Sequence, residues 1–458
     1  MSPRPRFARF PLSALAVTTA ASAALLACAS GTPAPSTSPA RDATAASSSA
    51  VASASPSSSV APLPSTVAST TPSSATSAST SPPTKVAEKG DHAFAARLYG
   101  TQRDAKGNLV ISPSSARVAL SMAYVGAKGK TATQMADVLG IDDDPAKVTT
   151  EMSATIARWN AGGDPKVKLR VANATWGDKS VPFTSSWQGT MKTSYGAPLQ
   201  LVDFKGAFEP ARKTINEWIG AKTEQKILGT LQPGDLDAYT RFVLVNATYF
   251  DGQWSHAFEA KVTADGAFHV AAGKDVQKKL MHQTSHFSYG ETPDAQVLSM
   301  PYGKGGYSMV VVLPKQTFGL SALETGMTGA TIDGWLAAPS YEQEVVVTFP
   351  RIEAEARLLL GGVLAKLGMV DAFDPAKSDF SGIAPHKGFD DNLYLAKVIQ
   401  KSWIKVDEKG TEAAAATVVI GAMPTAVAIP HVFDATHPFL YFLRDDAGNV
   451  LFMGRVIE

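Results

Sequence analysis

The segment that decides the fold reads Asp407-Glu408-Lys409-Gly410-Thr411-Glu412-Ala413-Ala414-Ala415-Ala416-Thr417. It follows a strand-like apolar segment, residues 398–406, and leads into another apolar run, residues 418–429. A glycine followed by very small side chains is unusual in a surface connection, where polar turn residues dominate. One interpretation is a segment that later slides between two strands. The other is an Ala-rich helix capped by Thr411.

The overall composition describes a neutral chain with enough apolar residues for a large core. It has 458 residues, a formal net charge of +1 and 45% hydrophobic residues. This balance gives no reason to expect nucleic acid as a partner. We expect a monomer without a cofactor. Because Cys28 is the only cysteine, no intrachain disulfide can form, and stability must come from packing.

Residues 1–28 are typical of an export signal. Arg4, Arg6 and Arg9 form a charged start, and residues 12–26 form a short apolar core. Leu25-Leu26-Ala27-Cys28 resembles a bacterial lipobox, whose cysteine becomes the lipidated N-terminus. We therefore predict an exported lipoprotein, anchored to a membrane in the periplasm or at the cell surface. An ordinary signal peptide and a secreted protein are the alternative.

Residues 29–85 are predicted to be a disordered tether. The segment is rich in Ser, Ala, Thr and Pro, with almost no aromatic side chains. Such a composition cannot bury enough apolar surface to offset the entropy lost on ordering. It would hold residues 86–458 away from the membrane as one folded domain.

The folded part has helical patterns first and strand patterns later. Helical spacing is found near residues 92–100, 118–126, 131–139 and 211–219. Runs of β-branched and aromatic residues follow at 241–250, 307–313, 344–349, 394–406 and 439–442. This order favours an α+β fold over alternating βαβ units.

Several short motifs, in a fixed order, resemble the serpin family from about residue 91 to the last residue. Each motif is weak alone, whereas the ordered set is highly specific. The set comprises 108–115 (NLVISPSS), 119–122 (ALSM), 245–250 (VNATYF), 300–302 (MPY), 308–314 (SMVVVLP), 367–369 (LGM), 379–382 (DFSG), 410–417, 437–439 (HPF) and 451–455 (LFMGR).

The resemblance implies a serpin fold with a large mixed central sheet, two smaller sheets, eight to nine helices and an exposed reactive loop. It also implies a suicide-substrate inhibitor of serine, or cysteine, proteases. The protease cleaves the loop, the loop inserts into the central sheet, and the covalently bound protease is trapped. Loop insertion of this kind is strand addition that releases stored strain.

The hinge residues suit such an insertion. Gly410 supplies backbone freedom, while Thr411 and the alanines Ala413, Ala414, Ala415 and Ala416 are small enough to enter between strands. Insertion would bury Val418 and Ile420, or Val419, on alternate faces of the sheet. The intact protein must then lie above its most stable form, held by a barrier.

The resemblance also assigns residues beneath the loop. Ser112, Ser115 and Asn246 match a polar cluster called the shutter, where strands part, and Gln400 stands where the family often has histidine. Trp254 and Glu408 match the point where the loop enters the sheet. Gln283 is interpreted as replacing the lysine that often pairs with this glutamate, so no salt bridge is predicted. Plain core packing is the alternative role for these residues.

The cleaved bond is predicted to lie between Met423 and Val427. Counting from the hinge indicates Pro424, whereas counting back from Pro438 indicates Val427. Bonds beside proline resist most serine proteases, so Thr425–Ala426 or Ala426–Val427 fit best, with Met423 as fallback. The absence of Lys and Arg from Thr411 to Pro430 favours an elastase-like or subtilisin-like target over a trypsin-like one.

Two other functions are weighed against inhibition. One is a surface-tethered serpin with a binding or chaperone-like role. The other is an exported hydrolase, but the sequence has neither a Gly-x-Ser-x-Gly motif nor a phosphate loop. His282 and His286 have the spacing of metal ligands on a helix, although their surroundings indicate a strand. We predict no metal site and no enzyme.

Overall fold

The computed structural model describes residues 90–162, 164–385, 392–411 and 429–458. The helices are α1 Asp91–Gly100, α2 Pro113–Tyr124, α3 Gly129–Leu139, α4 Pro145–Asn160, α5 Ser185–Thr193, α6 Phe204–Lys222, α7 Leu320–Thr325, α8 Gly329–Ala337 and α9 Leu360–Leu367, with 3-10 turns at Ala260–Val262 and Asp371–Phe373. The strands are β1 Leu109–Ile111, β2 Val167–Asp178, β3 Gln200–Val202, β4 Phe242–Gln253, β5 Ala264–Ala271, β6 Lys274–Glu291, β7 Ala295–Tyr302, β8 Tyr307–Pro314, β9 Tyr341–Pro350, β10 Ile352–Leu359, β11 Lys397–Val406, β12 Gly410–Thr411, β13 His431–Asp434, β14 Phe439–Asp445 and β15 Val450–Val456.

A six-stranded mixed sheet forms the centre of the fold. Its strand order is β10-β11-β4-β2-β3, and the short strand β12 pairs with the end of β4. Strand β4 is buried over nearly its whole length, because helices cover both faces of the sheet. This explains why its sequence, FVLVNATYF, is a continuous apolar run rather than an alternating one.

The remaining strands form a nine-stranded sheet in the order β1-β15-β14-β8-β7-β6-β9-β13, with β5 also on β6. The 18-residue strand β6 pairs with β5, β7 and β9 along different parts of its length. The two smaller sheets predicted from the family resemblance are therefore joined through β6. The α+β fold class is confirmed.

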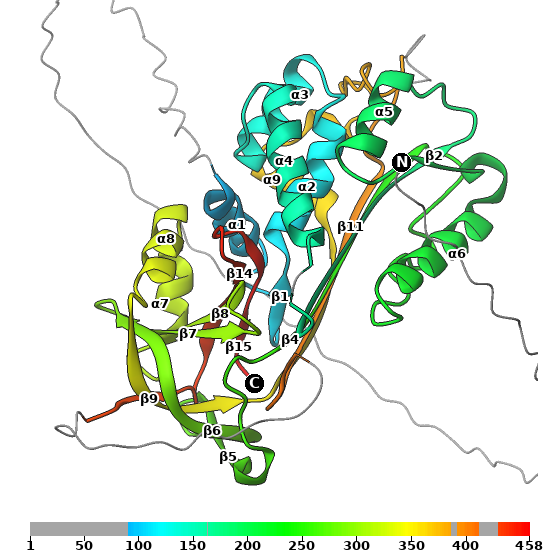
Figure 1. Ribbon diagram of the computed structural model, residues 1–458. Helices are drawn as coiled ribbons and strands as arrows, with labels where there is room; N and C mark the ends of the chain where they lie inside the picture. The colour runs from blue at the N-terminus through cyan, green and yellow to red at the C-terminus, as the bar shows by residue number, and fades with distance from the viewer. Residues whose placement is uncertain (1–89, 163, 386–391, 412–428) are drawn as a thin grey trace, which may run out of the picture. The chain divides into compact units, whose positions relative to one another are not determined.

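Helices lie on both faces of the central sheet. Figure 1 shows the sheet nearly edge-on, with α6 on one face and α2, α3, α4 and α9 on the other. Residues alternate along β4: Leu244 belongs to the large core with α2, whereas Val243 and Val245 pack with Ile215 and Ile219 of α6. No helix in the described part of the chain is both long and apolar enough to cross a bilayer.

Local sequence explains where several helices begin. Asp144 caps α4 by accepting a 2.8 Å hydrogen bond from the backbone N–H of Ala146, and Pro145 occupies the first helical position. Asp203 caps α6 in the same way by accepting from Gly206 at 2.7 Å. Both helices flank β2, so these caps help to fix the walls around one edge of the central sheet.

Candidate functional site

The central sheet contains two parallel junctions, a short one of three register pairs between β2 and β3 at its edge and a longer one in its interior between β4 and β11. Seven register pairs join the two strands, from Lys397–Val243 to Trp403–Tyr249. Beyond the last pair, β4 continues to Gln253 and β11 to Val406. We call this β4–β11 junction the seam. A parallel pair is slightly less stable per residue than an antiparallel one, so the seam is the natural place for the sheet to part.

The hinge lies at the open end of the seam. Gly410 and Thr411 form β12, which pairs antiparallel with Gln253 and Gly252 of β4. Strand β2 pairs with one edge of β4 as far as Gly252. Strand β12 therefore pairs with the opposite edge of β4, the edge that faces β11. Thr411 is in a strand, and the residues that would form the alternative helix lie outside the described part of the chain.

Gly410 is required by its surroundings. Its φ angle is +128°, and a Cβ atom there would overlap the carbonyl oxygen of Gly252. A side chain would therefore be strained and would also clash with the backbone of β4. Gly410 therefore has a backbone conformation that other residues rarely adopt. This agrees with the expectation that the chain needs a glycine at this position.

Trp254 fastens the turn before the hinge. Its indole N–H donates to the carbonyl of Asp407 at 3.0 Å, and its backbone N–H donates to the carbonyl of Lys409 at 2.9 Å. The ring stacks on Tyr302 with centroids 4.2 Å apart. The tryptophan therefore connects the nine-stranded sheet to the residues from which the loop departs.

Glu408 is nearly buried beside this turn and is bound by Arg351. The arginine donates from Nε to both carboxylate oxygens, at 3.0 and 3.1 Å, and from Nη2 to Oε1 at 2.6 Å. Burial alone would raise the pKa of Glu408, but hydrogen bonds, those from Arg351 foremost, outweigh it and hold this pKa below its usual range.

This ion pair corrects the prediction made for Gln283. The amide of Gln283 donates to the backbone carbonyl of His256 at 3.2 Å, and the cation at Glu408 comes from Arg351 instead. Arg351 lies between the last residue of β9 and the first of β10. Sequence reasoning missed it, because the contact depends on the register between β10 and β11.

A second polar cluster crosses the middle of the seam. Gln400 of β11 lies directly opposite Asn246 of β4, and its amide donates to the side-chain oxygen of Asn246 at 2.8 Å. The same amide donates to the carbonyl of Ser112 at 2.8 Å, and its oxygen accepts from the N–H of Ser112 at 3.1 Å. All three residues are essentially fully buried. Gln400 thus makes both kinds of hydrogen bond at the predicted shutter.

Two further residues belong to this cluster and were not predicted from the sequence. Asn246 donates to the hydroxyl of Ser115 and, at 2.6 Å, to the side-chain oxygen of Asn173 on β2. The hydroxyl of Thr248 donates to that of Ser115 at 2.7 Å. The polar cluster therefore extends from β2 across β4 to β11, with α2 beneath it.

Several predicted residues lie outside the part of the chain that the structure describes. They are Cys28, the tether, Ala413, Ala414, Ala415, Ala416, Met423, Pro424, Thr425, Ala426 and Val427. The two histidines with metal-ligand spacing, His282 and His286, both lie on strand β6. Four positions apart in a strand, their Cα atoms are roughly 13 Å from each other. Among the described residues, no group of three or more potential ligands could hold a metal ion.

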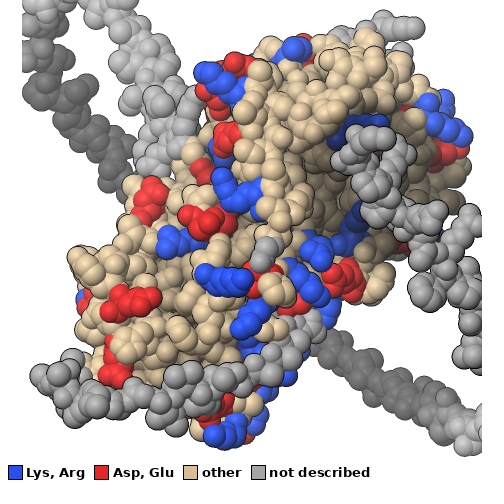
Figure 2. Space-filling view, in the orientation of Figure 1, with Lys and Arg blue, Asp and Glu red and all other residues tan. Residues whose placement is uncertain are grey.

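Charge is mixed on the surface around the site. Figure 2 shows Lys and Arg interspersed with Asp and Glu on this face rather than gathered by sign. The face drawn there thus offers no broad patch of one sign to attract a strongly charged macromolecule.

Comparison with known proteins identifies the family. The sequence model described as Serpin (serine protease inhibitor) matches residues 89–458. The protein belongs to the serpin family. Serpin B6 of Macaca fascicularis is 38% identical over 377 residues, covering 81% of this chain and 98% of that protein. Leukocyte elastase inhibitor A of Rattus norvegicus is 35% identical over 376 residues, covering 79% and 97%.

Solved structures agree with this assignment. The crystal structure of Serpin48, described as a highly specific serpin in the insect Tenebrio molitor, has a TM-score of 0.71 and 31% sequence identity. The match covers 80% of this chain and 96% of that one. Serpin relatives that inhibit proteases support protease inhibition as the general activity of this serpin.

The family assignment corrects the bare prediction of no enzyme, because it leaves out the part that a serpin plays in a protease reaction. Serpins are protease inhibitors that act as suicide substrates. A member therefore takes part in the reaction of a protease, although it does not catalyse one. The catalytic groups belong to the protease, and the serpin supplies the peptide bond on which they act.

Proposed function

We propose that this serpin is a suicide-substrate inhibitor that traps a serine protease by inserting its cleaved loop into the seam. One observation carries the proposal. Strands β4 and β11 are parallel to each other, while the hinge strand β12 already pairs antiparallel with β4 at the open end of the seam. A loop that continued β12 would be antiparallel to both neighbours, which is the more stable arrangement on each side.

The register of β12 predicts where the inserted residues would go. Continuing it along β4 brings Ala413 opposite Phe250, Ala415 opposite Thr248 and Thr417 opposite Asn246. Phe250 and Asn246 are buried on the α2 side of the sheet, so only small or uncharged side chains would arrive there.

The same register suits the polar Thr417 but places the charged Glu412 opposite a like charge. Glu412 would lie opposite Asp251, on the opposite face from the buried shutter. Thr417 would arrive at Asn246 and could replace the hydrogen bond that Gln400 makes to it in the intact protein. The small residues facing α2 and Thr417 at Asn246 support insertion in this register, whereas Glu412 opposite Asp251 opposes it, offset in part by Lys168, whose ammonium lies 3.9 Å from Asp251.

The proposed target is an elastase-like or subtilisin-like serine protease, because the predicted cleavage region lacks Lys and Arg. The test is to mix the protein with each protease class and to look for a denaturant-resistant covalent complex. Mass spectrometry of the released C-terminal fragment then identifies the cleaved bond. Complete cleavage without any complex, with every protease tested, would contradict inhibition and favour a binding or chaperone-like role.

We also propose that the serpin domain is exported and attached to a membrane through a lipid on Cys28. The proposal rests on Leu25-Leu26-Ala27-Cys28 and on the use of the only cysteine at this position. Several acyl chains on one residue would give a stable anchor. Metabolic labelling with palmitate tests it: the protein should take up label, and a Cys28→Ser variant should not.

A further inference from the structure

A cavity of about 600 Å³ lies beside the central sheet, away from the hinge. It follows one edge of β2, between the end of α4, the end of α6 and the turns before β8 and after β14. Strand β2 pairs with β4 from Val167 to Gly177, but with β3 only from Trp176 to Asp178. The cavity therefore occupies the part of this edge that β3 leaves open. Its volume is in the range of small-molecule sites.

The cavity combines aromatic rings with cations. Trp159, Trp218 and Tyr307 contribute aromatic surface, and the ammonium group of Lys222 lies 6.0 Å from the centre of the Trp218 ring. Arg158 and Lys304 also line it. A flat aromatic group could stack on Trp218, and a negative substituent on it would meet Lys222.

Two of the carboxylates at the cavity are already bound by protein donors. Asp445 accepts from the backbone N–H of Asn449 at 2.8 Å, from its amide at 2.7 Å and from the indole of Trp159 at 3.1 Å. Asp164 accepts from the backbone N–H groups of Lys166 and Lys304, at 2.9 and 2.5 Å. These bonds turn both acids toward the protein, so they oppose a bound anion less than their charge suggests.

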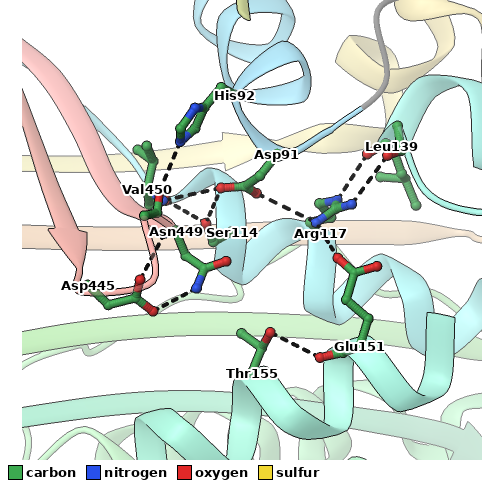
Figure 3. A network of polar contacts seen from close by, with 12 residues as sticks. Asp91, His92, Ser114, Arg117, Leu139, Glu151, Thr155, Asp445, Asn449 and Val450 are labelled. Carbon is green, nitrogen blue, oxygen red and sulfur yellow. Dashed lines mark hydrogen bonds and ion pairs between the residues drawn. The ribbon is translucent and has the colours of Figure 1, made fainter. Parts of the chain in front are cut away.

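One wall of the cavity is fixed by a wider polar network. Figure 3 shows Asp445 held by Asn449, next to Asp91 of α1 and Ser114 of α2. Asp91 accepts from Ser114 at 2.9 Å and from the N–H of Val450 at 3.2 Å. The turn between β14 and β15 is thereby connected by hydrogen bonds to the starts of helices α1 and α2.

The opposite wall belongs to a helix that must respond when the seam opens. Ile215 and Ile219 of α6 pack in one cluster with Val245 of β4 and Ile399 of β11, so α6 lies across both sides of the seam. In the proposed register, Val418 would arrive opposite Val245, on the face under α6. Inserting a strand there must shift α6 relative to the sheet.

We propose that this cavity binds a small aromatic anion, such as an aromatic carboxylate or sulfonate, and that the bound anion opposes loop insertion. The ligand would connect Trp218 and Lys222 of α6 to Arg158 and Lys304 on the other wall. A ligand that binds the closed sheet better than the opened one shifts the protein toward the closed form. This second part rests on the proposed function.

The test uses 8-anilinonaphthalene-1-sulfonate as probe and the full-length protein. Fluorescence titration should show one saturable site. Trp218→Ala should weaken binding roughly tenfold through loss of ring stacking. The double variant Lys222→Gln, Lys304→Gln should weaken it about threefold through loss of exposed charges. Lys274→Gln, at the exposed first residue of β6, is the matched control and should bind like the wild type.

If Trp218→Ala does not fold, the double variant still tests the site. Both of its lysines are exposed, so replacing them should not disturb folding. Absence of binding, or equal binding by all variants, would overturn the site. Loop-nicked protein should bind the probe at least about tenfold more weakly than intact protein, which is within the usual range of allosteric coupling. Equal affinity for the two forms would overturn the coupling. A separate melting curve of the nicked protein shows whether insertion itself occurs, so the two failures are distinguishable.

Discussion

The two edges of strand β4 are built differently. On one edge, β2 runs antiparallel over eleven register pairs, from Val167 to Gly177. On the other, β11 runs parallel over seven pairs, and the hinge occupies the place that β11 leaves. Both edges carry an amide partner for Asn246, Asn173 on β2 and Gln400 on β11. The difference favours β11 over β2 as the neighbour that parts from β4 in the proposed insertion.

The largest effect is expected from Gly410→Ala, which changes the hinge at the open end of the seam. The new Cβ would clash with Gly252 and would need a φ angle that alanine rarely adopts. The hinge should then fail to pair, and cleaved loops should be released without trapping. We expect the number of inhibitor molecules consumed per protease molecule to rise roughly tenfold or more, equal to about 1.4 kcal/mol in the partition between trapping and release.

Gly305→Ala is the matched control for this variant. Gly305 also has a positive φ angle, +97°, but its added Cβ would meet nothing within 4 Å. It should cost some stability and leave trapping unchanged. Equal loss of trapping in both variants would show that backbone strain, rather than the hinge contact, was responsible.

The second effect compares the two amide partners of Asn246. Gln400→Leu removes hydrogen bonds across the seam and leaves buried groups of Ser112 and Asn246 without partners. The intact protein should lose roughly 2–4 kcal/mol, because each unsatisfied buried group costs about 1–3 kcal/mol. Urea unfolding of the intact protein measures this loss.

Asn173→Leu removes the amide partner of Asn246 on the β2 edge of β4, and it is the comparison for Gln400→Leu. Asn173 is only half-buried, so water can replace part of its hydrogen bonding. We expect a smaller loss, about 1 kcal/mol. In loop-nicked protein the loss for Gln400→Leu should shrink, since the seam has parted, whereas that for Asn173→Leu should persist. Losses that stay the same for both variants after nicking would mean that the seam does not part.

The smallest effect is expected at the ion pair beside the hinge. Arg351→Gln removes the donors to Glu408, and the intact protein should lose about 1 kcal/mol, because nearly half of the arginine side chain is exposed to water. The pKa of Glu408 is lowered in the folded protein, so its contribution is present above the ordinary glutamate pKa, about 4.3, and disappears as the pH falls through the lower folded value. Melting curves between about pH 3 and pH 7 should show a weaker acid dependence for the variant. An unchanged acid dependence would exclude this pair as its source.

Much of the fold and of the site was accessible from sequence because the informative residues lie in short local patterns. The order of helical patterns before strand patterns was enough to predict the α+β class. The structure joins Ser115 to Asn246 directly and Ser112 to Asn246 through Gln400, while the roles of these residues and of the hinge stay predictions. Strand β2 was missed because its burial is irregular, with Arg170 among its exposed residues. Its position beside β4 depends on long-range pairing, which no local pattern records.

The partner of Glu408 could not be predicted for the same reason. Arg351 and Glu408 are 57 positions apart, and only the antiparallel register of β10 and β11 brings their neighbours Ile352 and Val406 together. Asn173 is likewise joined to Asn246 by strand register, and Thr248 is joined to Ser115 by the packing of α2 on β4. A contact that depends on strand register can be predicted only when the pairing of the strands is already known.

The central claim is that the seam accepts an added strand, and thermal unfolding tests it most directly. The loop is nicked with subtilisin, the cut is confirmed by mass spectrometry, and the midpoints of intact and nicked protein are compared under the same conditions. The account predicts a clearly higher midpoint for the nicked protein, because the inserted strand fills the place between β4 and β11. A midpoint equal to or below that of the intact protein would contradict it.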